Sequence, residues 1–245
     1  EIDVEKTGLT PGLKGKRIIV QGLGNVGYYA AYFLSNEDGA IITHVIERDG
    51  SIIDKEGIDI SSLKNHLIDK GTIKGFKGFT KSGAEILEEE ADILIPAAME
   101  LVINDKNAER IKTPLIVEAA NGPISSDADE ILNKRGVVII PDLYANAGGV
   151  TVSYFEWIKN LSRIRLGRLQ RRAQESQVST LIEGIENMTG KIFPSELKSK
   201  SIQGASELDL VRSGLEDTMI ETYNIISNVW NSNKDIPDLR TAAMM

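Results

Sequence analysis

The 245-residue sequence contains no cysteine and only two histidines, His44 and His66. The absence of cysteine excludes disulfides, thiol catalysis and zinc–thiolate sites. Two histidines are too few for a histidine-rich metal site, so we expect no metal and a structural or surface role for each. No apolar run approaches the roughly 18 residues that a membrane-spanning helix needs. If the protein is an enzyme, an organic cofactor or residues outside this sequence must supply the chemistry, because no catalytic side chain stands out here.

Basic residues are also in short supply, with 28 Lys and Arg against 36 Asp and Glu and a net charge of −8. An acidic chain without a long basic run is a poor ligand for nucleic acid or for an anionic membrane. The most basic stretch holds Arg163, Arg165, Arg168, Arg171 and Arg172, which form either a solvated helix face or a contact to an anion or effector. The missing cysteines fit a reducing compartment. We expect the cytoplasm, with the mitochondrial matrix as the alternative.

Short β-branched runs alternate with helical patterns over the first 150 residues. Strands are predicted at residues 17–21, 41–47, 92–95, 115–118 and 137–140, and helices at residues 26–35, 61–70, 82–90 and 125–134. The strands are apolar without alternation, which is typical of a parallel sheet covered by helices on both faces. Ser61 or Ser62 is expected to cap the second helix, and Gly136 follows the last one. The sequence therefore predicts an α/β class fold, a doubly wound, Rossmann-like and mostly parallel sheet.

After Gly149 the sequence becomes helical. Residues 150–170 and 205–232 are predicted helices, the second with one apolar stripe, and a loop is expected within residues 189–201. We therefore divide the chain into an α/β domain, residues 1–150, and a C-terminal helical extension, residues 151–245.

The sharpest motif is Gly22-Leu23-Gly24-Asn25-Val26-Gly27. Alone it is weak, but it follows a predicted strand and opens a predicted helix. Gly22 permits a tight turn, Gly24 lets a pyrophosphate approach the backbone, and Gly27 lets the helix pack against the sheet. The amide groups of the first helical turn then face the phosphates. This pattern predicts that residues 1–150 bind a dinucleotide.

An acidic residue accompanies the glycine motif at the expected distance. Glu47 lies 20 residues after Gly27 at the end of the second strand, where a carboxylate can accept hydrogen bonds from the adenosine ribose and repel a 2′-phosphate. Arg48 follows it and can pair with such a phosphate. We therefore expect NAD as the cofactor, with NADP or dual use as the alternative.

Two further segments follow strands, where open α/β sheets bind ligands. Small side chains at Ala97 and Ala98 leave room for a flat ring or a phosphate. Asn121 carries both a donor and an acceptor and can hold the nicotinamide carboxamide. Each segment can equally be an ordinary turn.

At this point the sequence resembles a known family, the hexameric glutamate dehydrogenases of the Glu/Leu/Phe/Val dehydrogenase group. The resemblance extends in register over nearly the whole chain. It rests on GLGNVG (22–27), DILIPAA (92–98), EAANGP (118–123), PDLYANAGGVTVSYFEW (141–157), GASE (204–207) and DLRTAA (238–243). Residues 161–203 are similar to the helical antenna insertion of the larger animal enzymes but shorter.

The resemblance implies roles for particular residues. It places the glycine motif and Glu47 at the dinucleotide, with Ala97, Ala98, Asn121 and Asn146 lining it toward the nicotinamide. It places Ser153, with Val150 nearby, at the substrate side chain. A hydroxyl can hydrogen-bond a γ-carboxylate, which favours glutamate over apolar amino acids. Ser153 can instead bond the backbone of its own helix.

The resemblance also implies an activity, the NAD(P)-dependent oxidative deamination of L-glutamate to 2-oxoglutarate and ammonia, by a homo-oligomer. In this family the lysine that polarises the substrate and its partner aspartate belong to an N-terminal domain, and no matching segment occurs here. We therefore expect this chain to bind dinucleotide and part of the substrate but to be inactive alone. The alternatives are a branched-chain or phenylalanine dehydrogenase and a non-catalytic nucleotide-binding module.

Overall fold

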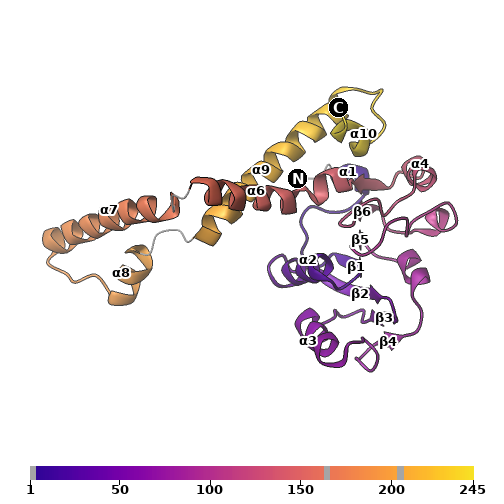
Figure 1. The fold of residues 1–245 in the computed structure, drawn as a ribbon, viewed down its shortest axis with the longest axis horizontal. Coiled ribbons are helices and arrows are strands. Elements are labelled where there is room, and N and C mark those ends of the chain that lie inside the picture. Colours follow the sequence, from indigo (N-terminus) through magenta and orange to yellow (C-terminus); the bar gives the residue numbers. More distant parts are fainter. Residues whose placement is uncertain (1–3, 163–165, 203–206) are drawn as a thin grey trace. The chain divides into compact units, whose positions relative to one another are not determined.

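The computed structural model describes residues 4–162, 166–202 and 207–245. Contacts divide the chain into two units. The first comprises Glu1–Ala147 together with Tyr223–Met245 and contains the sheet, and the second comprises Gly148–Thr222 and is helical (Figure 1). The C-terminal segment therefore packs with the sheet, although the intervening helical unit separates them in sequence.

Seven strands form one sheet in the order β4-β3-β2-β1-β5-β6-β7. They are β1 (Arg17–Gln21), β2 (Ile41–Glu47), β3 (Gly50–Ile53), β4 (Phe79–Thr80), β5 (Ile93–Pro96), β6 (Leu115–Val117) and β7 (Val138–Ile140). β1 pairs in parallel with both β2 and β5, and β6 and β7 continue the parallel sheet. The five strands predicted from the sequence and the mostly parallel α/β fold are confirmed. The order reverses between β1 and β5, the place where such sheets bind ligands.

Both faces of the sheet are buried, as the continuous apolar strands predicted. On β1, Ile18 and Val20 belong to one hydrophobic cluster and Ile19 to the other. The same alternation occurs on β7, where Ile140 and Ile139 face opposite sides. Because successive side chains of a strand point to opposite faces, an all-apolar strand requires a cover on both.

Helices supply the two covers. α2 (Asn25–Asn36) packs against β1 and β2 and, with α3 (Ile60–Lys70), contributes to the first cluster. α4 (Ser126–Lys134) contributes to the second cluster, while α10 (Leu239–Ala243) packs against β7 in the first. Parts of the chain far apart in sequence thus enclose one sheet.

Two local predictions need correction, and two strands were missed. Asp59, not Ser61 or Ser62, caps α3, since its carboxylate accepts a hydrogen bond from the Ser62 amide at 3.0 Å. The helix expected at 82–90 is a short 3₁₀ helix, η1 (Ala84–Glu88). β3 and β4 were not predicted; they add antiparallel strands beyond β2. Each is only two to four residues long, too short to show a clear hydrophobic period.

Over the described ranges, the remaining elements are three short helices and the four helices from α6 to α9. α1 (Val4–Thr7), η2 (Ala108–Arg110) and α5 (Asp142–Ala145) are short helices of the first unit. α6 (Ala147–Ser162), α7 (Leu166–Thr189), α8 (Ser195–Ile202) and α9 (Glu207–Ser232) follow. Among the described residues, no helix combines the length and apolar composition that crossing a membrane requires.

The loop expected within residues 189–201 separates α7 from α8. The Glu186 carboxylate accepts hydrogen bonds from the Phe193 amide at 2.9 Å and from Lys198 Nζ at 3.0 Å, which holds the two helices together. Arg163 and Arg165 lie outside the described residues, as do the side chains of Arg168, Arg171 and Arg172.

Candidate dinucleotide-binding site

The glycine motif forms a tight turn between β1 and α2. Gly22 has φ +90°, a conformation that glycine adopts without strain. A Cβ on Gly22 would lie 2.7 Å from the Ala98 Cβ, and a Cβ on Gly27 would lie 1.9 Å from the Gly22 carbonyl oxygen. These two glycines are therefore required by close packing within the protein.

Gly24 differs from them, because it is exposed and a Cβ there would have no neighbour within 4 Å. It is the N-cap of α2, and no side chain caps the first turn. The first helical amides have no acceptor within the helix. Asn25 and Val26, which begin this turn, are also exposed. An uncapped, exposed helix N-terminus beside an unobstructed glycine can accommodate a pyrophosphate, as the motif requires.

Glu47 lies beside this turn at the end of β2. Its Oε1 accepts a hydrogen bond from the Leu23 amide at 2.5 Å, and its Oε2 accepts one from the Arg48 amide at 3.3 Å. Glu47 is half-buried and Arg48 is exposed. The structure thus brings together the glycine motif and the acidic residue that the sequence analysis paired.

Lys64 is a neighbour of the turn that the sequence did not indicate. Its Nζ donates to the Leu23 carbonyl at 3.0 Å and lies 5.2 Å from the centre of the Tyr28 ring. Lys64 is on α3, 41 residues after Leu23. No motif spans that separation, so only the packing of α3 beside α2 reveals the contact.

Ala97 and Ala98 lie at the end of β5, next to the glycine turn. The Ala97 amide donates to the Gln21 carbonyl at 2.9 Å, which continues the pairing of β1 with β5. Ala98 is exposed. A larger side chain at either position would crowd Gly22 or Gly27, because the alanine Cβ atoms already face these glycines.

The two predicted amides also meet. Asn121 follows β6, and Asn146 is the C-cap of α5 after β7. Asn146 Nδ2 donates to Asn121 Oδ1 at 2.6 Å. This pairing orients Asn121 and leaves its own amide group available as a donor.

The two predicted substrate residues lie on α6, in the second unit. Val150 is 73% exposed. The Ser153 hydroxyl donates to the Gly149 carbonyl at 3.1 Å, within its own helix. A serine hydroxyl can also accept a hydrogen bond or rotate toward a ligand, so this contact is compatible with either interpretation of Ser153.

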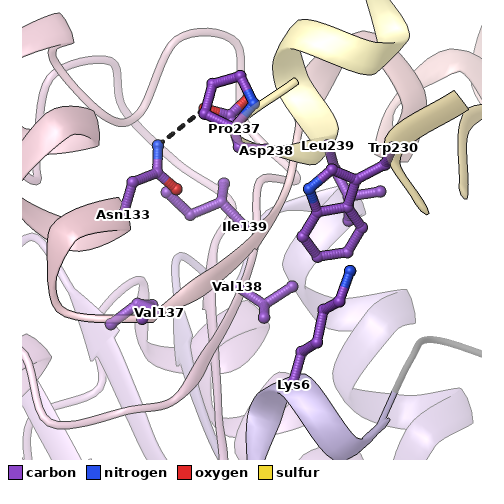
Figure 2. A pocket seen from close by; sticks show the side chains of 10 residues that line it. Lys6, Asn133, Val137, Val138, Ile139, Trp230, Pro237, Asp238 and Leu239 are labelled. Carbon is purple, nitrogen blue, oxygen red and sulfur yellow. Dashed lines mark hydrogen bonds between the residues drawn. The ribbon is translucent and has the colours of Figure 1, made fainter. Parts of the chain in front are cut away.

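A cavity of about 230 Å³ lies in a different part of the first unit (Figure 2). Val137, Val138 and Ile139 line it at the start of β7, with Lys6 and Trp230 opposite. It therefore opens near the amino end of a parallel strand, whereas the glycine turn lies at the carboxyl ends. The candidate dinucleotide site is an exposed surface rather than this cavity.

Similarity to known proteins decides the family. A family model described as "Glutamate/Leucine/Phenylalanine/Valine dehydrogenase" matches residues 4–189. The chain belongs to this dehydrogenase family. The matched segment contains every residue that we assigned to the dinucleotide or to the substrate.

Individual relatives agree with the family assignment. The chain is 49% identical to a "Probable glutamate dehydrogenase" of Sinorhizobium fredii over 242 residues, covering 96% of this chain and 55% of that protein. It is 48% identical to an "NADP-specific glutamate dehydrogenase" of Saccharolobus shibatae over 152 residues, covering 62% and 36%. The chain thus spans about half the length, or less, of these dehydrogenase relatives.

A solved structure supports the fold. The hetero-hexameric glutamate dehydrogenase of Thermus thermophilus in its leucine-bound form aligns with a TM-score of 0.71 and 23% identity, covering 98% of this chain and 46% of that one.

Proposed function

We propose that this chain binds NAD at the glycine turn and Glu47, and that it serves the oxidative deamination of L-glutamate to 2-oxoglutarate and ammonia. The observation that carries the proposal is the joining of Glu47 to the turn. Its carboxylate accepts from the Leu23 amide, which places it beside the uncapped start of α2. When bound, a nicotinamide dinucleotide supplies a hydride acceptor, which the side chains of this protein cannot.

Glu47 also supports NAD as the preferred cofactor. A half-buried carboxylate beside the adenosine ribose accepts hydrogen bonds from its hydroxyls and repels a 2′-phosphate. Arg48 supports the alternative of NADP or dual use, because it is exposed and adjacent. The name of the Saccharolobus relative is consistent with that alternative.

Titration of the 245-residue chain with NADH and NADPH tests the assignment. We expect tighter binding of NADH. Glu47→Gln should weaken the binding of NADH by about tenfold, since a hydrogen bond to a charged group contributes about 1.5 kcal/mol or more. The same variant should have a smaller preference for NADH over NADPH than the wild type. Glu130→Gln is the control, because Glu130 is exposed on α4 and pairs only weakly with Lys134 at 3.5 Å. Unchanged NADH affinity in the Glu47 variant would refute the role of this carboxylate.

The remaining predicted residues are assigned on the same basis. Ala97 and Ala98 leave room beside the turn, and the Asn121–Asn146 pair holds the nicotinamide carboxamide. Val150 and Ser153 contribute to the substrate pocket, where the serine hydroxyl selects the γ-carboxylate. A comparison of glutamate with leucine as substrates of the full-length protein tests that selection, and a preference for leucine would contradict it.

We also propose that the chain alone does not turn over glutamate. None of the residues assigned above is a general acid or base at the substrate, and this chain spans about half of its relatives. A steady-state assay of the 245-residue chain with glutamate and NAD should show no NADH formation while NADH still binds. Measurable deamination would show that the catalytic residues lie within this chain.

The wider setting is proposed from the family and the composition. Residues 1–150 are proposed to carry the dinucleotide site. The antenna-like insertion proposed at residues 161–203 belongs to the helical region, and its residues 163–165 and 203 lie outside the described residues. The full-length enzyme is proposed to be a homo-hexamer, without nucleic-acid or membrane partners. The absence of cysteine favours the cytoplasm, with the mitochondrial matrix as the alternative.

A further inference from the structure

A guanidinium group from the C-terminal helix lies among three carboxylates beside the nicotinamide end of the proposed site. Arg240 Nη2 donates to Glu118 Oε1 at 2.8 Å, and its Nε donates to Asp129 Oδ1 at 3.0 Å. Its Nη1 lies 3.5 Å from Asp142 Oδ1. Glu118 is fully buried and Arg240 is 23% exposed. The DLRTAA segment contains this arginine, but the sequence indicated no partner for it.

The carboxylates continue the network toward the two amides. Glu118 Oε2 accepts from the Asp142 amide at 2.8 Å, and Asp142 Oδ2 accepts from the Gly122 amide at 2.8 Å. Gly122 is the residue after Asn121. Asp142 is also the first residue of α5, and Asn146 is the C-cap of that helix. The backbone amide of Asn146 donates to the Asp142 backbone carbonyl at 3.1 Å. Asp142 therefore restrains the backbone beside Asn121 and at Asn146.

The electrostatics of the three carboxylates favour a cation at the position of Arg240. Burial raises the pKa of the Glu118 carboxyl, and the Arg240 hydrogen bond opposes that rise. Burial likewise raises the pKa of Asp129, again opposed by Arg240. Without the guanidinium, Glu118 and Asp142 would be neighbouring carboxylates, and no other ion pair of either is found in the part of the chain that the structure describes. Repulsion between like charges in a poorly solvated site then favours a shift of the Asp142 carboxylate away from Glu118, which would disturb its hydrogen bond from the Gly122 amide.

We propose that Arg240 is a positioning residue, which fixes the Asn121–Asn146 pair for the nicotinamide through Asp142. It contacts neither amide directly and acts only through the Asp142–Gly122 hydrogen bond and the start of α5. The inference rests on the proposed dinucleotide function and adds to it a residue from the far end of the chain. It predicts that loss of Arg240 selectively weakens recognition of the nicotinamide half, because no hydrogen bond or ion pair among the described residues joins this network to the glycine turn or to Glu47.

The test compares NADH with ADP-ribose, which lacks the nicotinamide, as ligands of the 245-residue chain. Arg240→Met should raise the Kd for NADH about tenfold, the loss of one hydrogen bond, and leave the Kd for ADP-ribose within about twofold. Arg110→Met is the matched control, since Arg110 also pairs with a carboxylate, Glu88 at 2.6 Å, but its side chain is exposed and bonds Glu88 and Lys106 rather than a residue of the Arg240 network. It should change neither Kd.

Further variants test whether Arg240 acts through Asp142. Asp142→Ala leaves the Arg240 contacts to Glu118 and Asp129 intact and should show the same selective loss of NADH affinity. The double variant Arg240→Met/Asp142→Ala should lose no more than either single variant, because both changes cut one pathway. If Arg240→Met does not fold, Arg240→Lys replaces it, since an ammonium group keeps the charge but cannot bridge three carboxylates.

The outcomes are distinguishable. Three results would overturn the positioning role alone. They are an equal loss of affinity for NADH and ADP-ribose in the Arg240 variants, an unchanged affinity for NADH in those variants, and additive losses of NADH affinity in the double variant. A wild-type chain that binds both probes equally tightly would show that Asn121 and Asn146 do not hold the nicotinamide. A wild-type chain that binds neither probe would overturn the proposed dinucleotide site itself, and with it this inference.

Discussion

Substitution of Gly27 by alanine tests the packing on which the glycine turn depends. The added Cβ would lie 1.9 Å from the Gly22 carbonyl oxygen and 2.9 Å from its carbonyl carbon. Close contacts between a carbon and a carbonyl oxygen occur at about 3.3 Å, so the gap must widen by roughly 1.4 Å. Both opposing atoms are backbone, so no side-chain rotation can relieve the contact. α2 must move away from β1, or the turn must change its conformation.

The size of the effect follows from two opposing terms. Overpacking of this kind costs typically about 1–3 kcal/mol, and the contact with backbone places Gly27 at the upper end. Alanine is favoured over glycine within a helix by about 1 kcal/mol. We therefore expect the free energy of unfolding to fall by roughly 2 kcal/mol. Urea unfolding followed by circular dichroism should show a lower midpoint with an unchanged slope.

Gly24→Ala is the matched comparison, because its Cβ would enter open space. Its φ of −67° is available to alanine, so the stability loss should stay below about 1 kcal/mol, the effect of a poorer N-cap. Its affinity for ADP-ribose should nevertheless fall at least about tenfold, since the methyl group occupies the surface that a pyrophosphate approaches. Wild-type stability in Gly27→Ala would refute the packing argument. Wild-type affinity in Gly24→Ala would refute the phosphate contact.

Three other substitutions test local features of the fold. Asp59→Ala should destabilise the protein by about 1 kcal/mol at neutral pH through loss of the α3 cap. Hydrogen bonds from the Ser62 backbone amide and hydroxyl lower the pKa of Asp59, so the stability advantage of the wild type should be lost as the pH falls below about 4 through the folded-state pKa. A pH-independent difference in Tm between the two proteins would contradict this role of the carboxylate. Burial lowers the pKa of His44, so the neutral imidazole contributes to stability above pH 6.5, and this contribution is lost as the pH falls through the lower folded-state pKa. His44→Gln should therefore show a smaller decline in Tm over that pH interval. Identical profiles of Tm against pH in wild type and variant would argue against a buried neutral imidazole. Gly78→Ala should destabilise the protein by about 1–3 kcal/mol more than Gly75→Ala. Both glycines have positive φ, but of the two only a Cβ on Gly78 would meet a carbonyl oxygen, that of Ile53 at 2.3 Å. Equal losses of stability in thermal melts of the two variants would contradict the steric explanation.

The order of elements in the first unit was largely predictable. β1, β2, β5, β6 and β7 were each located to within one residue at either end, because buried parallel strands are short, apolar and bounded by glycine, proline or charge. The glycine motif and Glu47 were also found from sequence. Their spacing follows from one strand–helix–strand unit, which is local in the chain.

Other features depend on contacts that no local pattern records. The capping of α3 by Asp59 was missed, because aspartate and the two serines that follow are all good N-caps and only the backbone conformation selects one. The short antiparallel β3 and β4 were missed for lack of length. Lys64 and Arg240 were missed because their partners are distant in sequence. Lys64 bonds Leu23, 41 residues away, and Arg240 bonds Glu118, 122 residues away.

The sequence by itself determined the parallel α/β architecture, the glycine turn and its acidic partner, since each depends on residues close together in the chain and on the periodicity of burial. Only the tertiary structure decided which distant side chains support them. The C-terminal helix α10 packs on β7 and brings Arg240 to Glu118, although the helical unit separates them in sequence. The physical reason is that burying a carboxylate is costly unless its charge is compensated, and a cation can compensate it from any position in the sequence that the fold brings close.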